Sequence, residues 1–152
     1  KWGAITTLSN LAVADREDKF KKAFKRYFSG VTGTSMITAA NIVGNSWKIA
    51  RAKPDLADRI AGELLRVEDA VYESKGKPSP ECRNVVIVVA IDSFARFYDV
   101  LENKKPVEDF IRRQLKNTRK QVAEKAGRFL ETSAPGVVLT RGKAVVSGKE
   151  SL

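Results

Sequence analysis

Asp92 is the acidic residue of this sequence that is the best candidate for a chemical role, because it follows the apolar run VVIVVAI. Arg96 lies four residues later, so on a helix the two side chains would share a face and form an ion pair. A partly buried carboxylate can act as a general acid or base. A carboxylate that is paired with an arginine more often has a structural role. We interpret Asp92 and Arg96 as a polar feature of the fold and assign no catalytic residue.

Other catalytic and metal-binding chemistry has little support. The 152 residues include one cysteine, Cys82, and no histidine. This composition excludes histidine-based triads, cysteine-rich zinc sites and a disulfide within the chain. The acids Asp15, Glu17 and Asp18 are interleaved with cations and predict a solvated turn before a helix. These features favour a protein without catalytic activity, and we expect neither a metal nor a cofactor.

Positive charge is the strongest binding signal. There are 28 Lys and Arg residues against 18 Asp and Glu residues, which gives a net charge of +10. Such a balance is typical of a solvated surface rich in lysine, or of a protein with an acidic partner, either a protein surface or a nucleic acid. We expect the second helix of each successive helix pair to carry these cations. The candidate basic binding surface consists of Lys21, Lys22, Lys25, Arg26, Arg59, Arg66, Arg112, Arg113 and Lys116.

Amphipathic helices must position these residues. Between Phe20 and Phe28, apolar residues recur at i, i+3, i+4, i+7 and i+8 with lysines between them, which is typical of a helix with one buried face. Residues 2–12 show a similar apolar face. We expect about seven helices in one domain over residues 1–133, followed by a weakly ordered tail at residues 134–152. The helical pattern starts at once after Lys1, so we expect that a preceding segment belongs to the protein.

The stretch NVVIVVAIDSFARFYD, residues 84–99, has features of both a strand and a helix. Its β-branched run favours a strand. No comparable apolar run accompanies it, however, as a sheet of such strands would require. Ala90, Phe94 and Phe97 have helical spacing, and burial can override the modest helix cost of β-branched residues. We predict the most buried helix of the protein here.

Four segments share a pattern of small and apolar positions, and each is interpreted as the first helix of a pair: WGAITTLSNLA, ITAANIVGNSWKIA, VVAIDSFARFY and QVAEKAGRFL. In this respect residues 1–132 resemble the HEAT and armadillo class of α-helical repeat proteins. The resemblance implies an all-α protein, a right-handed α-α superhelix of stacked antiparallel helix pairs that bury one another's apolar faces. The segments recur at irregular intervals, and a non-repetitive helical bundle is the alternative.

The resemblance also implies a function. We expect a non-catalytic protein-binding or scaffolding module whose cations hold an acidic surface or peptide of another protein. The alternative is a nucleic-acid-binding helical-repeat protein, including a DNA glycosylase for alkylated bases, with Trp2 and Trp47 as stacking groups and Asp92 as the acid. No apolar run approaches the roughly 20 residues of a membrane span. The single cysteine agrees with a cytoplasmic location, and the oligomeric state is not indicated.

Overall fold

A computed structural model describes residues 2–134, without the side chain of Trp2. Apart from Ala134, the predicted tail lies outside these residues. Seven α-helices form in the described range, which confirms the prediction of an all-α protein with about seven helices. They are α1 (Trp2–Ala14), α2 (Lys19–Phe28), α3 (Met36–Ala52), α4 (Ala57–Leu65), α5 (Pro80–Phe97), α6 (Lys105–Gln114) and α7 (Lys120–Thr132).

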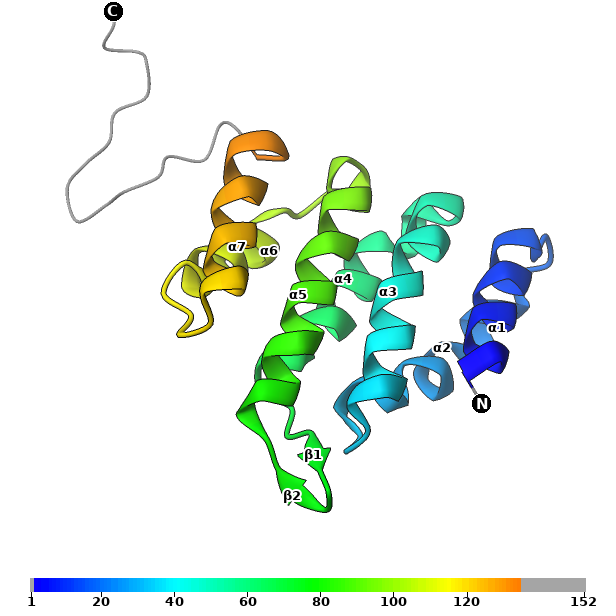
Figure 1. The fold of residues 1–152 in the computed structure, drawn as a ribbon. Coiled ribbons are helices and arrows are strands. Elements are labelled where there is room, and N and C mark those ends of the chain that lie inside the picture. The colour runs from blue at the N-terminus through cyan, green and yellow to red at the C-terminus, as the bar shows by residue number, and fades with distance from the viewer. Residues whose placement is uncertain (1, 135–152) are drawn as a thin grey trace, which may run out of the picture.

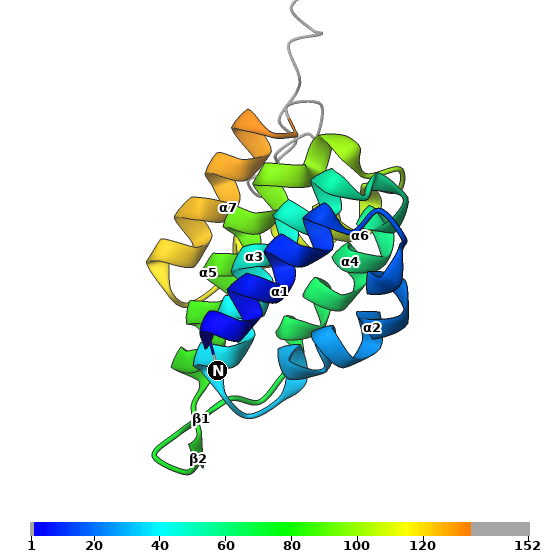
Figure 2. The same ribbon diagram turned by 90° about the vertical axis from the view of Figure 1, so that its right-hand side faces the viewer.

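The helices form two layers, and consecutive helices alternate between them (Figures 1 and 2). Helices α1, α3, α5 and α7 lie side by side in what we call the front layer, and α2, α4 and α6 form the back layer. Helix α3 packs along both α1 and α5, and α7 packs against α5 and α6. The apolar core lies between the two layers, where each helix buries one face.

Helix α5 resolves the ambiguity between strand and helix in favour of a helix. Its N-cap is Ser79, whose hydroxyl accepts a hydrogen bond from the Cys82 amide at 3.3 Å, and its first residue is a proline. Ala90 and Phe94 are fully buried. Because α5 has helical neighbours in both layers, burial outweighs the helix cost of its β-branched residues.

The front layer is closely packed where α3 meets α5. A Cβ atom at Gly44 would lie 3.3 Å from Cγ1 of Val89 on α5, which is closer than most side-chain contacts. A larger residue at this position would therefore require the Val89 side chain to shift by a few tenths of an ångström. Glycine avoids this tight contact.

A short β-hairpin forms within the polar stretch ESKGKPSP, residues 73–80. Strands β1 (Glu73–Ser74) and β2 (Lys77–Pro78) pair in antiparallel fashion. Lys75 and Gly76 between them have φ angles of 53° and 77°, as a two-residue hairpin turn with two left-handed residues requires. The hairpin extends beyond the ends of α3 and α5 (Figure 1).

All three tyrosines are buried, which leads to a test of the packing. Burial raises the pKa of Tyr27, Tyr72 and Tyr98 to about 12, and for Tyr98 the carboxylate of Glu108, which accepts its hydrogen bond, adds to the rise. We expect ultraviolet titration of the folded protein to show tyrosinate only near pH 12, whereas the unfolded chain titrates near about 10. The tyrosines therefore stabilise the fold below about pH 10, and this contribution is lost as the pH rises towards 12. If a tyrosine of the folded protein ionised near pH 10, its hydroxyl would not be buried as the structure shows.

Candidate binding site

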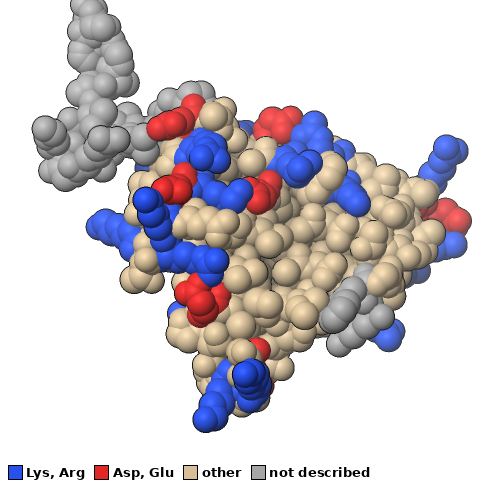
Figure 3. Space-filling model, viewed as in Figure 1, with Lys and Arg blue, Asp and Glu red and all other residues tan. Residues whose placement is uncertain are grey.

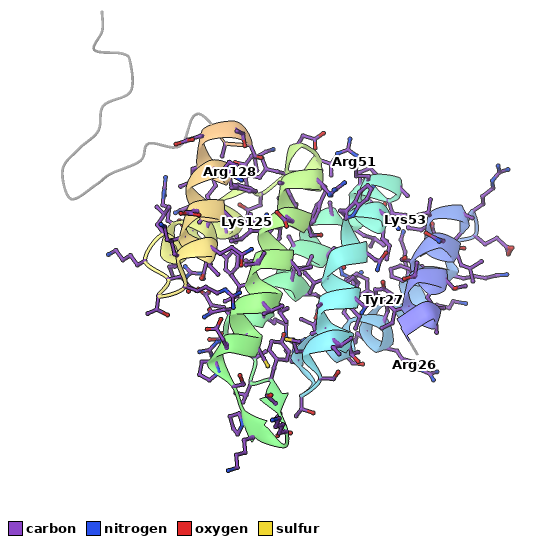
Figure 4. All side chains as sticks on the ribbon, in the orientation of Figure 1. Arg26, Tyr27, Arg51, Lys53, Lys125 and Arg128 are labelled. Atoms are coloured by element: carbon purple, nitrogen blue, oxygen red, sulfur yellow. The ribbon has the colours of Figure 1, made fainter. Side chains whose placement is uncertain are left out.

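Asp92 and Arg96 do not pair with each other. Nζ of Lys125 on α7 donates to both carboxylate oxygens of Asp92, at 2.8 and 3.1 Å, and so links α7 to α5 (Figure 4). The guanidinium of Arg96 instead stacks on the Trp47 ring at 4.9 Å. The expected pair along one helix is therefore replaced by contacts between helices, because α5 has a neighbour on each side in the front layer. Asp92 is exposed rather than partly buried, and Trp47 is half-buried with one ring face covered.

Several of the predicted binding cations are engaged within the protein. Arg59 stacks on the Phe24 ring at 4.3 Å and thereby links α4 to α2. Four others form ion pairs: Lys21 with Asp18 and Asp55, Arg66 with Glu63, Arg112 with Asp109, and Arg113 with Glu68. Exposed pairs of this kind stabilise a protein little, but they lower the positive charge that α4 and α6 present to a partner.

The remaining cations are Lys22, Lys25, Arg26 and Lys116, which are all exposed. None of them has a carboxylate within ion-pair distance in residues 2–134. The first three lie on α2 at i, i+3 and i+4, so they share one face of this helix. We call Lys22, Lys25 and Arg26 the cationic rim.

A groove of about 610 Å³ runs beside the cationic rim, at the end of the stack that Figure 2 faces. Its lining is chiefly apolar, and α3 contributes the residues farthest from the end of the stack. Arg26 joins the groove to the cationic rim. We call it the α1–α2 groove, and its lining consists of Ala4, Ile5 and Leu8 on α1, Phe20, Ala23, Arg26 and Tyr27 on α2, Ser29 and Gly30 after it, and Thr38 and Ile42 on α3.

Exposed leucines continue the apolar surface of the groove along α1. Leu8 is 51% exposed and Leu11 is 60% exposed, whereas Ile5 and Ala12 on the same helix are buried. Single exposed apolar residues are common, but a contiguous apolar surface beside a groove marks an interaction site. The apolar face that the sequence predicts for residues 2–12 is thus divided, with one half packed inside the protein and the other half open.

The walls of the groove also contain unused hydrogen-bonding groups. The hydroxyls of Tyr27 and Thr38 are buried and have no hydrogen-bond partner in the described part of the chain. Tyr27 points between α1 and α3, while Arg26 lies at the outer surface (Figure 4). Phe20 and Phe28 pack edge-on against the Tyr27 ring, with centroid distances of 5.4 and 4.9 Å, and hold it in place.

Lys53 fixes the turn between α1 and α2. It is only 7% exposed, and its Nζ donates to the Asp15 carbonyl at 2.8 Å and to the Asp18 carboxylate at 3.1 Å (Figure 4). The Asp15 carboxylate in turn accepts hydrogen bonds from the amides of Phe20, at 2.7 Å, and Glu17, at 3.2 Å. These bonds hold α2 against α1, so the α1–α2 groove is preformed.

Glu17 and Asp18 are exposed in the turn before α2, as the interpretation of the acidic cluster as a solvated turn predicted, but Asp15 is not. The Asp15 side chain is only 11% exposed. The hydrogen bond from the Phe20 amide lowers the pKa of Asp15, and the hydrogen bond from Lys53 lowers that of Asp18. Sequence reasoning missed Lys53, whose only signal is its position directly before Pro54 at the end of an apolar helix.

The described residues offer little for other kinds of chemistry. Within residues 2–134, no three His, Cys, Asp or Glu side chains come together in a way that could hold a metal ion. No helix in this range has the length and apolar character needed to cross a membrane. Comparisons with protein-family models, curated proteins and solved structures gave no match. Apolar contact and charge are therefore what the α1–α2 groove and its cationic rim provide.

Proposed function

We propose that the chain is a non-catalytic protein-binding module of the HEAT-like helical-repeat type, and that an acidic partner docks at its α1–α2 end. One observation carries the proposal: the preformed apolar groove lies directly beside the cationic rim. The alternation of helices between two layers supports the repeat assignment. The right-handed superhelix of stacked pairs is part of the proposal, since the resemblance implies it.

The combination of surfaces favours a protein over a nucleic acid. Protein interfaces join an apolar centre to a polar margin, as the α1–α2 groove and the cationic rim do. Binding to a phosphate backbone depends mainly on many spaced cations. Four of the predicted cations are in ion pairs, and the face of the front layer carries its charges at the margins around an uncharged middle (Figure 3). Exposed Leu8 and Leu11 have no role in contacting phosphates.

The test is selection of binding peptides from a displayed library of random charge, followed by charge reversal. We expect selected peptides to be rich in Asp and Glu. The triple variant Lys22→Glu, Lys25→Glu and Arg26→Glu should weaken their binding by about tenfold or more, because each lost rim charge removes an attraction and adds a repulsion. Isothermal titration calorimetry measures the affinities.

The matched control reverses three exposed cations away from the groove, Lys75, Lys77 and Lys116, to glutamate, which changes the net charge equally. An equal loss of binding in both triple variants would mean unspecific attraction and would overturn the proposal. Duplex DNA provides the comparison for the alternative function. A DNA complex that survives physiological salt and is lost in the rim variant would favour nucleic-acid binding instead.

A further inference from the structure

We infer that the α1–α2 groove accepts a single amphipathic helix with an acidic flank, laid along the open side of α1; this inference rests on the proposed function. A helix is a definite kind of occupant, distinct from an extended peptide or a second copy of the chain. Three features of the described residues support it: the packing around α1, the different character of the two ends of the stack, and the position of the cationic rim.

The open side of α1 is equivalent to positions that helices fill elsewhere in the front layer. Helix α3 lies between α1 and α5, and α5 lies between α3 and α7. In the described part of the chain, α1 has a front-layer neighbour on one side only. Ala4, Leu8 and Leu11 are exposed on α1 at i, i+4 and i+7, which is the spacing of an apolar stripe along one side of a helix. A helix laid there would continue the packing of the layer.

The two ends of the stack differ in a way that points to an occupant at α1. The outward residues of α7 are polar and include exposed Lys120, Glu124 and Arg128. A polar outer face is how a terminal repeat remains soluble without a neighbour. The open side of α1 is instead apolar and adjoins the α1–α2 groove. Within residues 2–134, α7 therefore presents a polar outer face, whereas the open side of α1 presents an apolar surface to another helix.

The cationic rim predicts that the side of the bound helix that faces it carries acidic residues. Lys22, Lys25 and Arg26 lie within about one turn of α2, so carboxylates one turn apart on a helix beside α1 would face them. A second copy of the chain is a poor occupant, since its net charge is also +10 and a symmetric contact would bring two cationic rims together. Helix-in-groove binding therefore predicts apolar anchors at i, i+3 or i+4 and i+7, with Asp or Glu beside them.

The probe is a designed peptide of about five helical turns that carries this pattern of apolar anchors and a glutamate flank, and fluorescence anisotropy measures its binding. We expect about tenfold or greater loss of affinity when a central proline prevents the helix, or when the same residues are scrambled so that the faces mix. Leu8→Ser with Leu11→Ser should cause a similar loss, because both leucines would become buried by the peptide. Since both are exposed in the free chain, this variant should keep the wild-type thermal transition.

The matched control replaces two exposed apolar residues outside the groove, Ile37→Ser with Val71→Ser, and should bind as the wild type does. Undiminished binding by the Leu8 and Leu11 variant, or by the proline peptide, would overturn the helix inference.

The fate of the proposed function is decided separately. If the rim variant still bound acidic library peptides more weakly than the wild type does, the proposed function would stand. A dimer of the free chain in sedimentation that the Leu8 and Leu11 variant abolishes would assign the groove to a second copy and also overturn the inference. If no acidic peptide of any kind bound, the proposed function itself would fail.

Discussion

Replacing Phe94 by alanine is expected to lower the free energy of unfolding by about 3–5 kcal/mol. The ring is fully buried in the last turn of α5, and its centroid lies 5.8 Å from those of both Phe97 and Phe110. Because Phe110 belongs to α6, the cavity would weaken the contact between the two layers as well as the packing within one. The total stability of such a domain is about 5–15 kcal/mol, so the variant should be close to unfolding. Urea denaturation followed by circular dichroism measures the loss.

The matched control for Phe94→Ala is Leu11→Ala, at a position that is 60% exposed. Surface substitutions of this kind change the stability by about 0.5 kcal/mol or less. The urea midpoint should therefore shift strongly for Phe94→Ala and hardly at all for Leu11→Ala, with little change in the slope of the transition. Similar small shifts for both variants would mean that α5 is not the core of the protein.

Helix α5 shows what the sequence can predict about this fold. Its β-branched run favoured a strand locally, but the helical spacing of Ala90, Phe94 and Phe97 predicted the observed helix. The pattern between Phe20 and Phe28 likewise predicted α2. Both predictions depend on periodicity, which is a local property of the chain. Burial of one face of each helix favours the same helical conformation that the periodicity predicts, so the sequence and the structure agree for α2 and α5.

Contacts between helices could not be predicted in this way. Asp92 had a plausible partner four residues away, but Lys125 reaches it from α7, and Arg96 stacks on Trp47 instead. Local spacing says which side chains share a helix face and not which neighbouring helix lies opposite. The division of the apolar face of α1 has the same cause, because only the position of α3 determines that Ile5 is covered and Leu8 is open. The α1–α2 groove is therefore a feature of the tertiary structure.

Lys53→Met is the second substitution for which we expect a large effect, a loss of about 1.5–3 kcal/mol in the free energy of unfolding at neutral pH. Methionine retains the apolar stem of the side chain, so the change mainly removes the hydrogen bonds of Nζ to the Asp15 carbonyl and the Asp18 carboxylate. Lys21→Met is the matched control, since Lys21 also pairs with Asp18 but is exposed. Its loss should be much smaller, because exposed ion pairs stabilise a protein little, and an equal loss in both variants would contradict the role of Lys53.

The pH dependence distinguishes loss of the Lys53 contacts from a packing defect. The pKa values of Asp15 and Asp18 are lowered in the folded protein, so both carboxylates stabilise it at pH values above their unfolded pKa of about 3.9. This stabilisation is lost as the pH falls through the lower folded pKa values. The difference in stability between the wild type and Lys53→Met should therefore shrink in acid, whereas a packing defect would leave it constant. Because the same contacts orient α2 against α1, Lys53→Met should also weaken binding of the acidic peptide, although Lys53 does not line the α1–α2 groove.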